Sequence, residues 1–410
     1  MELLKGIKVI EFGEGVAGPL AAQFLGDLGA EVIKVERPSG DWGRTMGPGL
    51  TEGSYHFLSL NRNKRNISID VKTETGLKIA QELIKEADIF LTNFRPGAMD
   101  KLHLGYGDVV KINPSIIYGR VSGYEHDGKL SKLPGSDTVL QAVSGIMSHI
   151  GDEDGEYFRT TFQVIDHAAA RDLLIGVLSA LVSRLMGRLP KGPIDISLFS
   201  TGVGLQLQQW QEYIFTGSPP KRVGNKNSVL SPAGIYEVLN DERITIAVLR
   251  DEHFVKLCKA LHIDYLLDDE RYKTNELRLI NRESLDEVLV PIFKKQSKSY
   301  WLAFLEKSDI LVAPVNTIAD IDQDEHLRNC IPFYTIPSSP LLEKYQRSEV
   351  EVVGLPIRFE NEKEELKYPP PLKGEHTTTI LQELGYSKEA IEQFMSTSAV
   401  LQAQIEEKIK

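Results

Sequence analysis

The sequence predicts an α/β fold: a large domain built on a Rossmann-like, doubly wound parallel sheet, together with a smaller α+β domain. From the N-terminus to about residue 200, short apolar segments alternate with segments of helical periodicity, which is the pattern of a parallel sheet covered by helices. Several apolar segments end in glycine or polar residues. Because ligands of such sheets bind at the carboxyl ends of the strands, we expect the functional site there.

Residues 6–37 predict a strand, a glycine turn, a helix and a second strand. Gly13, Gly15 and Gly18 match the G-x-G-x-x-G spacing of dinucleotide-binding turns, and Glu36 follows where such proteins hold a ribose. A glycine turn before a helix also offers N–H groups to any phosphate. Coenzyme A carries an adenine, a ribose and a diphosphate as well. The motif therefore leaves three interpretations open: a dinucleotide site, a site for CoA or another nucleotide, and a structural turn.

The following elements continue the alternation. Thr73 can cap a helix whose apolar residues fall on one face. Residues 168–187 predict a long helix that is apolar nearly all round, and we therefore expect it to be central and buried. Further strands are expected at 67–71, 89–92, 116–121 and 194–199.

The domain boundaries are predicted from composition. A segment rich in Gly, Pro, Lys and Asn covers residues 217–227, which is typical of a linker. We expect the first part of the large α/β domain at 1–216 and a small domain at 228–315. Residues 316–410 would then form a linker and the return to the large domain.

The bulk composition excludes several classes of protein. The 410 residues carry a net charge of −11, which disfavours nucleic acid and anionic membranes as partners. The longest apolar stretch, 173–186, is too short to span a bilayer, and no signal-peptide pattern is present. Cys258 and Cys330 show no metal-ligand spacing. The sequence therefore predicts a soluble, cytoplasmic protein without a metal site.

Several short motifs occur in a fixed order along the chain, and in that order they resemble the family III CoA-transferases, the CaiB/BaiF family that includes formyl-CoA transferases. The resemblance covers nearly the whole chain and favours CoA over a dinucleotide. The motifs include Ala17-Gly18-Pro19, Gly40-Asp41, Asn63-Lys64-Arg65, Asp70-Val71-Lys72, Asn93-Phe94-Arg95-Pro96-Gly97, Ala313-Pro314-Val315-Asn316 and Leu372-Lys373-Gly374-Glu375.

The resemblance implies that Asp166 is a catalytic nucleophile, because it precedes Leu174-Ile175-Gly176 at the spacing of the family's nucleophilic aspartate. From the residues alone, an Asp before a long helix is more often a helix cap. A helix N-terminus favours a carboxylate, so we expect Asp166 to be ionised. The implied reaction moves CoA from an acyl-CoA to a small carboxylic acid through an aspartyl-CoA intermediate. It uses CoA and acyl-CoA as substrates, with no tightly bound cofactor.

The same resemblance implies contacts with CoA at eight positions. Three of them, Arg37, Lys72 and Lys101, would supply charge for the phosphates, although a solvated surface charge is the commoner role of Lys and Arg. The eight positions are Val16, Ala17, Arg37, Ile69, Lys72, Asn93, Phe94 and Lys101.

Two alternatives to a transferase follow from the same residues. Ser136 and Asp137 stand where the related α-methylacyl-CoA racemases carry a His-Asp pair, and a serine cannot act as their proton-transfer base. A racemase is therefore the second interpretation, and Asp137 is expected to position the nucleophile or the acceptor. A non-catalytic CoA-binding protein is the alternative of another class, which would not need a carboxylate at Asp166.

The resemblance also implies a homodimer in which two ring-shaped chains interlock. Residues 217–227 and the extended segment 332–371 could serve as the long connections that close each ring. The sequence does not choose the CoA donor or the carboxylate acceptor.

Overall fold

The computed structural model describes residues 1–47, 53–188, 191–343, 345–362 and 365–403, so the predicted return segment 316–410 lies partly outside the described residues. The chain forms two compact units. The large unit contains residues 1–146, 160–208 and 331–410, and the smaller unit contains 147–159 and 209–330. The predicted boundary after 216 lies 8 residues beyond the unit limit at 208, and the one after 315 lies 15 residues before the limit at 330. Residues 147–159 belong to the smaller unit.

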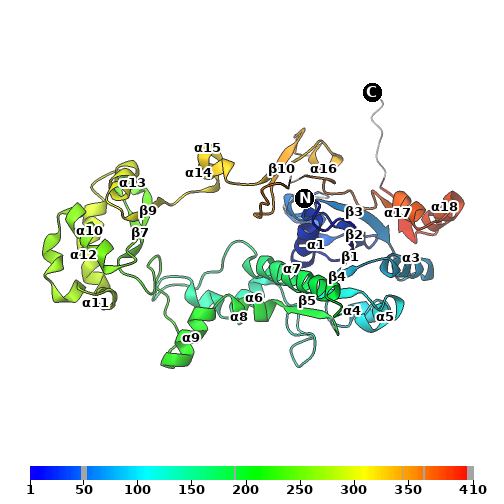
Figure 1. The fold of residues 1–410 in the computed structure, drawn as a ribbon, viewed down its shortest axis with the longest axis horizontal. Helices are drawn as coiled ribbons and strands as arrows, with labels where there is room; N and C mark the ends of the chain where they lie inside the picture. Colours follow the sequence, from blue (N-terminus) through cyan, green and yellow to red (C-terminus); the bar gives the residue numbers. More distant parts are fainter. Residues whose placement is uncertain (48–52, 189–190, 344, 363–364, 404–410) are drawn as a thin grey trace. The chain divides into compact units, whose positions relative to one another are not determined.

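The large unit is built on a seven-stranded sheet (Figure 1) with the order β12-β3-β2-β1-β4-β5-β6. Every pairing in it is parallel except that of β12 with β3. An α/β fold with a mostly parallel central sheet is therefore confirmed. Its strands are β1 (Lys8–Phe12), β2 (Glu31–Glu36), β3 (Lys64–Ile69), β4 (Ile89–Thr92), β5 (Ile117–Ser122), β6 (Ile194–Ser197) and β12 (Val400–Leu401).

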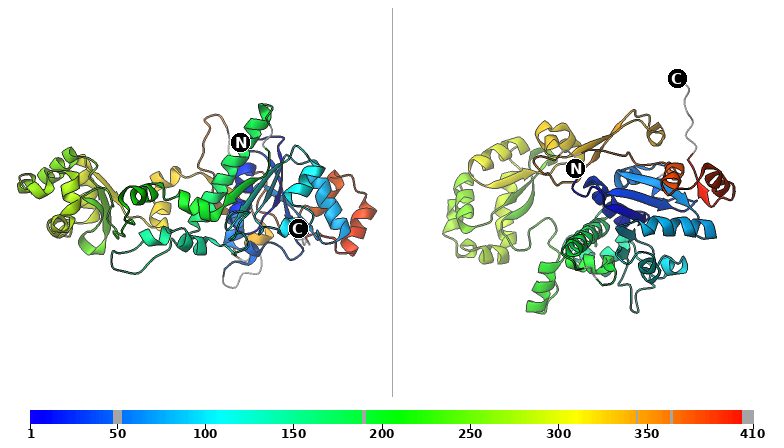
Figure 2. Two further views of the ribbon diagram at one scale, coloured as in Figure 1. Left: turned by 90° about the horizontal axis from the view of Figure 1, so that it is seen from below. Right: turned by 45° about the vertical axis from the view of Figure 1, so that its right-hand side comes forward.

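Helices cover both faces of this sheet. Along β1, Val9 belongs to the core beneath one face and Ile10 to the core beneath the other, as expected for strand side chains that alternate between faces. The left panel of Figure 2 shows the large unit with the long helix α7 on one side of the strands and α3 and α18 on the other. The first face carries α1 (Ala17–Asp27) and α7 (Val164–Leu185); the second carries α3 (Glu74–Lys85), α5 (Tyr106–Ile112), α17 (Thr377–Glu383) and α18 (Lys388–Ser396).

Two features of α7 differ from the prediction. The helix begins at Val164 rather than at 168, so Asp166 lies inside its first turn instead of before it. It is also not buried all round, because Ile175, Val182 and Leu185 are 62%, 56% and 86% exposed. The contacts within the chain thus leave some apolar side chains of this helix exposed.

The strand order reverses between β1 and β4. The two strands are neighbours in the sheet although β2 and β3 lie between them in the sequence. Loops that leave such neighbours run to opposite faces of the sheet and open a crevice at the carboxyl ends of the strands. Gly13 follows β1 and Asn93 follows β4, so the fold places both at this crevice.

The remaining elements complete the two units. The smaller unit packs an antiparallel sheet of β7 (Ala233–Glu237), β8 (Arg243–Ala247) and β9 (Leu311–Pro314) against helices around its own apolar core. Its helices are α10 (Asp251–Leu261), α11 (Asn275–Ile280), α12 (Arg282–Phe293), α13 (Lys298–Lys307), α14 (Ile318–Gln323) and α15 (Glu325–Asn329). The large unit adds α2 (Tyr55–Leu60), α4 (Ala98–Lys101), α6 (Asp137–Val143), α8 (Leu198–Gly204), α16 (Pro340–Glu343) and the hairpin of β10 (Phe333–Ile336) and β11 (Val350–Val353). Helix α9 (Leu207–Thr216) crosses from one unit to the other.

Candidate active site

The glycine turn after β1 is shaped by close contacts that leave no room for side chains. Gly15 has a φ of +75°, and a Cβ atom there would meet the Trp42 ring at 2.1 Å. A Cβ atom on Gly18 would lie 3.1 Å from the side chain of Asn93. Glycine is therefore required at Gly15 both by the backbone conformation and by the indole packed on it.

Asn93 fastens the turn to the end of β4. Its Nδ2 donates to the carbonyl oxygen of Glu14 at 2.7 Å, and its Oδ1 accepts from the amide of Glu14 at 2.9 Å. This reciprocal pair joins the loops after β1 and β4 across the switch point. The amide of Asn93, which the sequence analysis assigned to CoA, thus has a structural partner as well.

Asp166 lies in the first turn of α7, but another residue caps that helix. Oδ2 of Asp137 accepts from the amides of Ile165 and Asp166 at 2.8 and 3.2 Å. Its Oδ1 accepts from Nε2 of Gln141 at 2.6 Å. The interpretation of Asp166 as an ordinary helix cap is therefore wrong, because Asp137 accepts hydrogen bonds from the first amides of the helix. Among the described residues, none forms a hydrogen bond with the Asp166 carboxylate.

The electrostatic surroundings of Asp166 also differ from the expectation. Burial, and then the nearby charge of Asp137, raise its pKa to about 7. Desolvation and a like charge both disfavour the ionised form, and here they outweigh the helix N-terminus. Asp166 is therefore only partly ionised near neutral pH, and no described Lys or Arg forms an ion pair with it.

A cavity of about 280 Å³ joins Asp166 to the switch point. Its wall contains the glycine turn, the loop after β4, the end of β5 and the start of α6. Among the predicted residues, Val16, Ala17, Asn93, Phe94, Asp137 and Asp166 line it. The structure thus brings six of the ten predicted site residues to one cavity.

Arg37 lies close to this cavity through Glu14. Its Nε and Nη2 atoms are each 3.1 Å from the Glu14 carboxylate, and its side chain is 55% exposed. Glu14 itself lines the cavity. Burial raises the pKa of Glu14 to about 7, although Arg37 acts to lower it. A phosphate that binds Arg37 would therefore share this guanidinium with Glu14.

Besides Arg37, three further predicted CoA contacts do not line the cavity. Ile69 is buried at the end of β3 and packs into the apolar core. Lys72 and Lys101 are exposed on the loops after β3 and at the end of α4. Ile69 is the last residue of β3, and Lys72 and Lys101 come after the carboxyl ends of β3 and β4.

The structure removes the ribose-binding role of Glu36. Its carboxylate is buried and accepts hydrogen bonds from Arg44, from the amide of Asp41 and from Asn66. A carboxylate with these partners is not available to hold a ribose hydroxyl. This finding contradicts the dinucleotide interpretation of the glycine motif.

Sequence reasoning missed Glu14 and Trp42, which also line the cavity. Glu14 is the unspecified residue between two motif glycines, and Trp42 follows the Gly40-Asp41 motif, so no residue pattern singles out either. No histidine is among the described residues that line the cavity. The proton-transfer base of a racemase is therefore not found at this place.

Two further findings concern metals and membranes. Within the described ranges, no cluster of His, Cys, Asp or Glu could hold a metal ion. None of the helices in these ranges has the length and apolar character needed to cross a membrane.

A glycine turn at a switch point beside a carboxylate of raised pKa is typical of an α/β enzyme that binds a nucleotide-like ligand. Comparison with known proteins makes the class specific. A sequence model of CoA-transferase family III matches residues 4–377. The chain therefore belongs to the family III CoA-transferases, and the alternatives of a racemase and of a non-catalytic CoA-binding protein are not favoured.

Relatives and solved structures agree with this assignment. The mouse succinyl-CoA:glutarate CoA-transferase is 35% identical over 98% of this chain and 91% of its own length. A succinate–glutarate CoA-transferase of Agrobacterium fabrum is 31% identical over 93% of this chain and 95% of its own. A CaiB/BaiF family protein from Brucella suis superposes with a TM-score of 0.80 at 33% identity, covering 93% of this chain and 99% of the other.

Proposed function

We propose that this protein transfers CoA from an acyl-CoA thioester to a small carboxylic acid, with Asp166 as the nucleophile of an aspartyl-CoA intermediate. The observation that carries the proposal is the division of roles between two aspartates. Asp137 caps α7, whereas Asp166, in the first turn of that helix, lines the same cavity. This difference supports a role of the Asp166 carboxylate toward a substrate.

The proposed reaction begins with attack of an Asp166 oxygen on the thioester carbonyl. The C–S bond breaks, CoA leaves as a thiolate, and Asp166 and the acyl group form a mixed anhydride. The thiolate then attacks the aspartyl carbonyl, which releases the donor acid as a carboxylate and leaves an aspartyl-CoA thioester. Covalent catalysis of this kind divides one difficult exchange into easier steps.

The second half of the reaction repeats these steps in reverse order. The acceptor carboxylate attacks aspartyl-CoA, expels the CoA thiolate and forms a second anhydride. The thiolate attacks the acceptor's carbonyl, which gives the new acyl-CoA and restores the Asp166 carboxylate. No proton is consumed and no oxidant is needed, so the residues of the cavity need only bind, orient and stabilise developing charge.

We propose that CoA binds along the carboxyl edge of the sheet. Val16, Ala17 and Phe94 would contact it inside the cavity, and Arg37 would pair with a phosphate. Ile69, Lys72 and Lys101 remain proposed contacts outside the cavity, where the longer arm of CoA would run. The positive charges of Arg37, Lys72 and Lys101 support an anionic ligand in a chain of net charge −11.

A dicarboxylate is the acceptor class that we propose first. Arg95 is exposed and lines the same cavity as Asp166, so it could bind the second carboxylate of such an acid while the first one reacts. The names of the mouse and Agrobacterium relatives, which pair succinate with glutarate, support this choice.

The test is a panel of carboxylates incubated with succinyl-CoA and followed by chromatography of the CoA esters. We expect glutarate to give a new CoA ester in an amount equal to the succinyl-CoA consumed, and a monocarboxylate of similar length, such as butyrate, to give less. Hydrogen exchange at Cα of a branched acyl-CoA without any transfer would support a racemase instead. CoA binding with neither reaction would support a binding protein.

We also propose an interlocked homodimer in the cytoplasm. Exposed apolar residues occur on α7 and, separately, on α9, and they support a partner surface because large exposed apolar patches often mark protein–protein contacts. In α9, Leu207, Ile214 and Phe215 are 69%, 65% and 80% exposed. Sedimentation is expected to show a dimer at nanomolar concentration, and a stable monomer there would contradict the proposal.

A further inference from the structure

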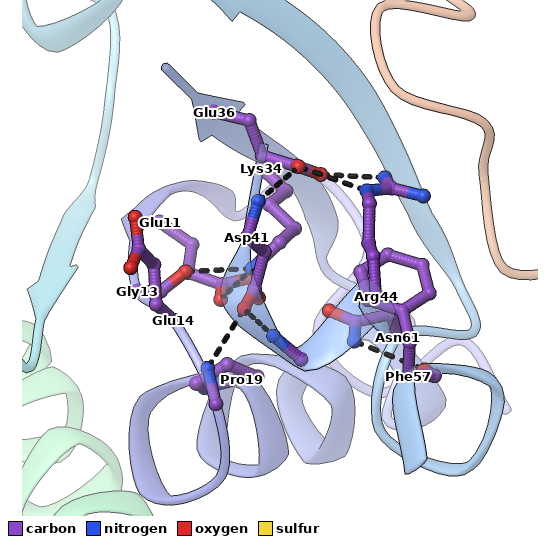
Figure 3. A network of polar contacts seen from close by, with 12 residues as sticks. Glu11, Gly13, Glu14, Pro19, Lys34, Glu36, Asp41, Arg44, Phe57 and Asn61 are labelled. Carbon is purple, nitrogen blue, oxygen red and sulfur yellow. Dashed lines mark hydrogen bonds and ion pairs between the residues drawn. The ribbon is translucent and has the colours of Figure 1, made fainter. Parts of the chain in front are cut away.

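The glycine turn rests on four charged residues that are almost completely buried. We call them the turn-support cluster: Glu11, Lys34, Asp41 and Lys64. Their exposed fractions are 0%, 0%, 2% and 0%. They balance two carboxylates against two ammonium groups, and Figure 3 shows three of them, Glu11, Lys34 and Asp41, together with Gly13.

Lys34 binds a backbone carbonyl of the glycine turn, and Lys64 binds one in the first turn of α1. Nζ of Lys34 donates to the Gly13 carbonyl at 2.6 Å, and Nζ of Lys64 donates to the Pro19 carbonyl at 2.8 Å. Glu11 bridges the two lysines, with one carboxylate oxygen 3.1 Å from Lys34 and the other 2.8 Å from Lys64. The cluster therefore binds the chain just before α1 and within the first turn of that helix.

Asp41 completes the arrangement from the other direction. Its Oδ2 lies 2.9 Å from Nζ of Lys34, and its Oδ1 accepts from the amide of Gly15 at 3.0 Å and from that of Gly43 at 2.7 Å. One carboxylate thus fixes the turn and the segment that carries Trp42. This matters for the cavity, because the Trp42 ring packs on Gly15 and lines the cavity wall.

Stability alone is a weak reason for such a cluster. Removing four charges from water costs several kcal/mol per ion, and apolar residues of similar volume often stabilise a fold as well or better. What apolar residues cannot do is bind a carbonyl and an amide at fixed positions. Lys34 and Asp41 of this cluster form hydrogen bonds with the backbone of the turn that would bind CoA.

We propose that the turn-support cluster positions the glycine turn for CoA binding, and that Asp41 is its most direct positioning residue. The inference rests on the proposed function, in that it takes CoA as the ligand of the turn. Asp41 acts through Gly15 and Trp42 and does not itself line the cavity.

The variant that tests this inference is Asp41→Asn, which keeps the size of the side chain but removes its charge. Asp27→Asn is the matched control. Asp27 is 1% exposed and pairs with Arg62 at 2.6 Å. It lies at the far end of α1, about 15 Å from the helix start at a rise of about 1.5 Å per residue. Both variants thus disturb a buried ion pair, and only one of these pairs touches the turn.

We expect Asp41→Asn to raise the Kd for CoA, measured by calorimetry, about tenfold. Turnover at saturating acyl-CoA should change by less than about threefold, since Asp166 and Asp137 are untouched. Asp27→Asn should lower the melting temperature to a similar degree but change the Kd less than about twofold. Equal effects of the two variants on the Kd would overturn the inference.

Two further outcomes remain decisive. If Asp41→Asn does not fold, hydrogen exchange in the native protein replaces it: the inference requires a protected Gly15 amide in the absence of ligand, and rapid exchange of that amide would overturn it. If the native protein does not bind CoA at all, the proposed function fails, and this inference fails with it. If the native protein binds CoA and Asp41→Asn binds it with the same Kd, the inference is overturned, whereas the proposed function is not.

Discussion

The turn-support cluster and the aspartate pair of Asp137 and Asp166 are two charged groups of the large unit, and they differ in how charge is balanced. In the cluster, two carboxylates meet two ammonium groups. Burial alone would raise the pKa of Asp41, but Lys34 and the amides of Gly15 and Gly43 hold it below its usual value. In the aspartate pair, burial and the charge of Asp137 raise the pKa of Asp166 to about 7.

The difference separates a positioning role from a reactive one. In the cluster, ion pairs stabilise the carboxylates, which makes them less reactive, and their hydrogen bonds fix the backbone. A carboxylate near a like charge is held at higher free energy, and it gains when it forms a covalent bond that removes its charge. Each group can be changed without touching the other, and the following predictions use that separation.

Loss of the Asp166 carboxylate should have the largest effect. Asp166→Asn keeps the shape of the side chain, but a neutral amide cannot attack a thioester. We expect steady-state CoA transfer to fall at least about a thousandfold, which corresponds to about 4 kcal/mol of activation free energy. Calorimetry should show CoA binding within about threefold of the native value. Near-normal transfer would place the nucleophile elsewhere.

The ion pair of Arg37 and Glu14 should affect binding rather than turnover. Arg37→Ala is expected to raise the Kd for CoA about tenfold or more, as for the loss of a charged hydrogen bond. Glu14→Gln should lower the Kd, because it removes the carboxylate that competes with phosphate for Arg37. Calorimetry on both variants checks the pair, and a weaker-binding Glu14→Gln would show that Glu14 helps to bind CoA.

The pH dependence of kcat/KM should follow the ionisation of Asp166. Attack requires the carboxylate, and the pKa is raised, so activity is lost as pH falls through about 7. We expect a rise of about tenfold between pH 6 and pH 8. Glu14→Gln is the control, because the pKa of Glu14 also lies at about 7. A flat native profile, or a rise that disappears in this control, would contradict the assignment to Asp166.

The smallest expected effect is on thermal stability. Asp166→Asn should lower activity but raise the melting temperature. Because the folded-state pKa of Asp166 is raised, the native state binds more protons than the unfolded state between pH 4 and 7, and this group's contribution to stability falls as pH rises across that range. Asp166→Asn removes the loss. At pH 8 its melting temperature should exceed the native value by on the order of 2 °C, and the gain should shrink at pH 5. A lower melting temperature at both pH values would contradict the raised pKa assigned to Asp166.

The strand and helix pattern of the large unit could be predicted because the periodicity of apolar residues reports burial directly. The cap at Thr73 is confirmed by its bond to the Gly76 amide, and such a cap depends only on neighbours in the sequence. The cap of α7 could not be predicted, because Asp137 lies 29 residues before Asp166. Only the fold brings the two together.

The same limit explains the other errors. The exposed apolar residues of α7 look identical in sequence to buried ones, since periodicity does not say which chain covers them. Glu36 has the spacing of a ribose ligand, yet Arg44 engages it, and that pairing arises from tertiary contact. The sequence patterns also do not single out Lys34 and Lys64 as buried, although each binds a backbone carbonyl and a carboxylate in the interior.

The central claim is that Asp166 forms a covalent intermediate, and trapping tests it most directly. The native protein is incubated with succinyl-CoA and hydroxylamine, which attacks the aspartyl carbonyl of an anhydride or a thioester. Peptide mass spectrometry should then find a hydroxamate at Asp166, and none in Asp166→Asn treated in the same way. A hydroxamate on another residue, or an unmodified Asp166 in protein that transfers CoA under these conditions, would contradict the account.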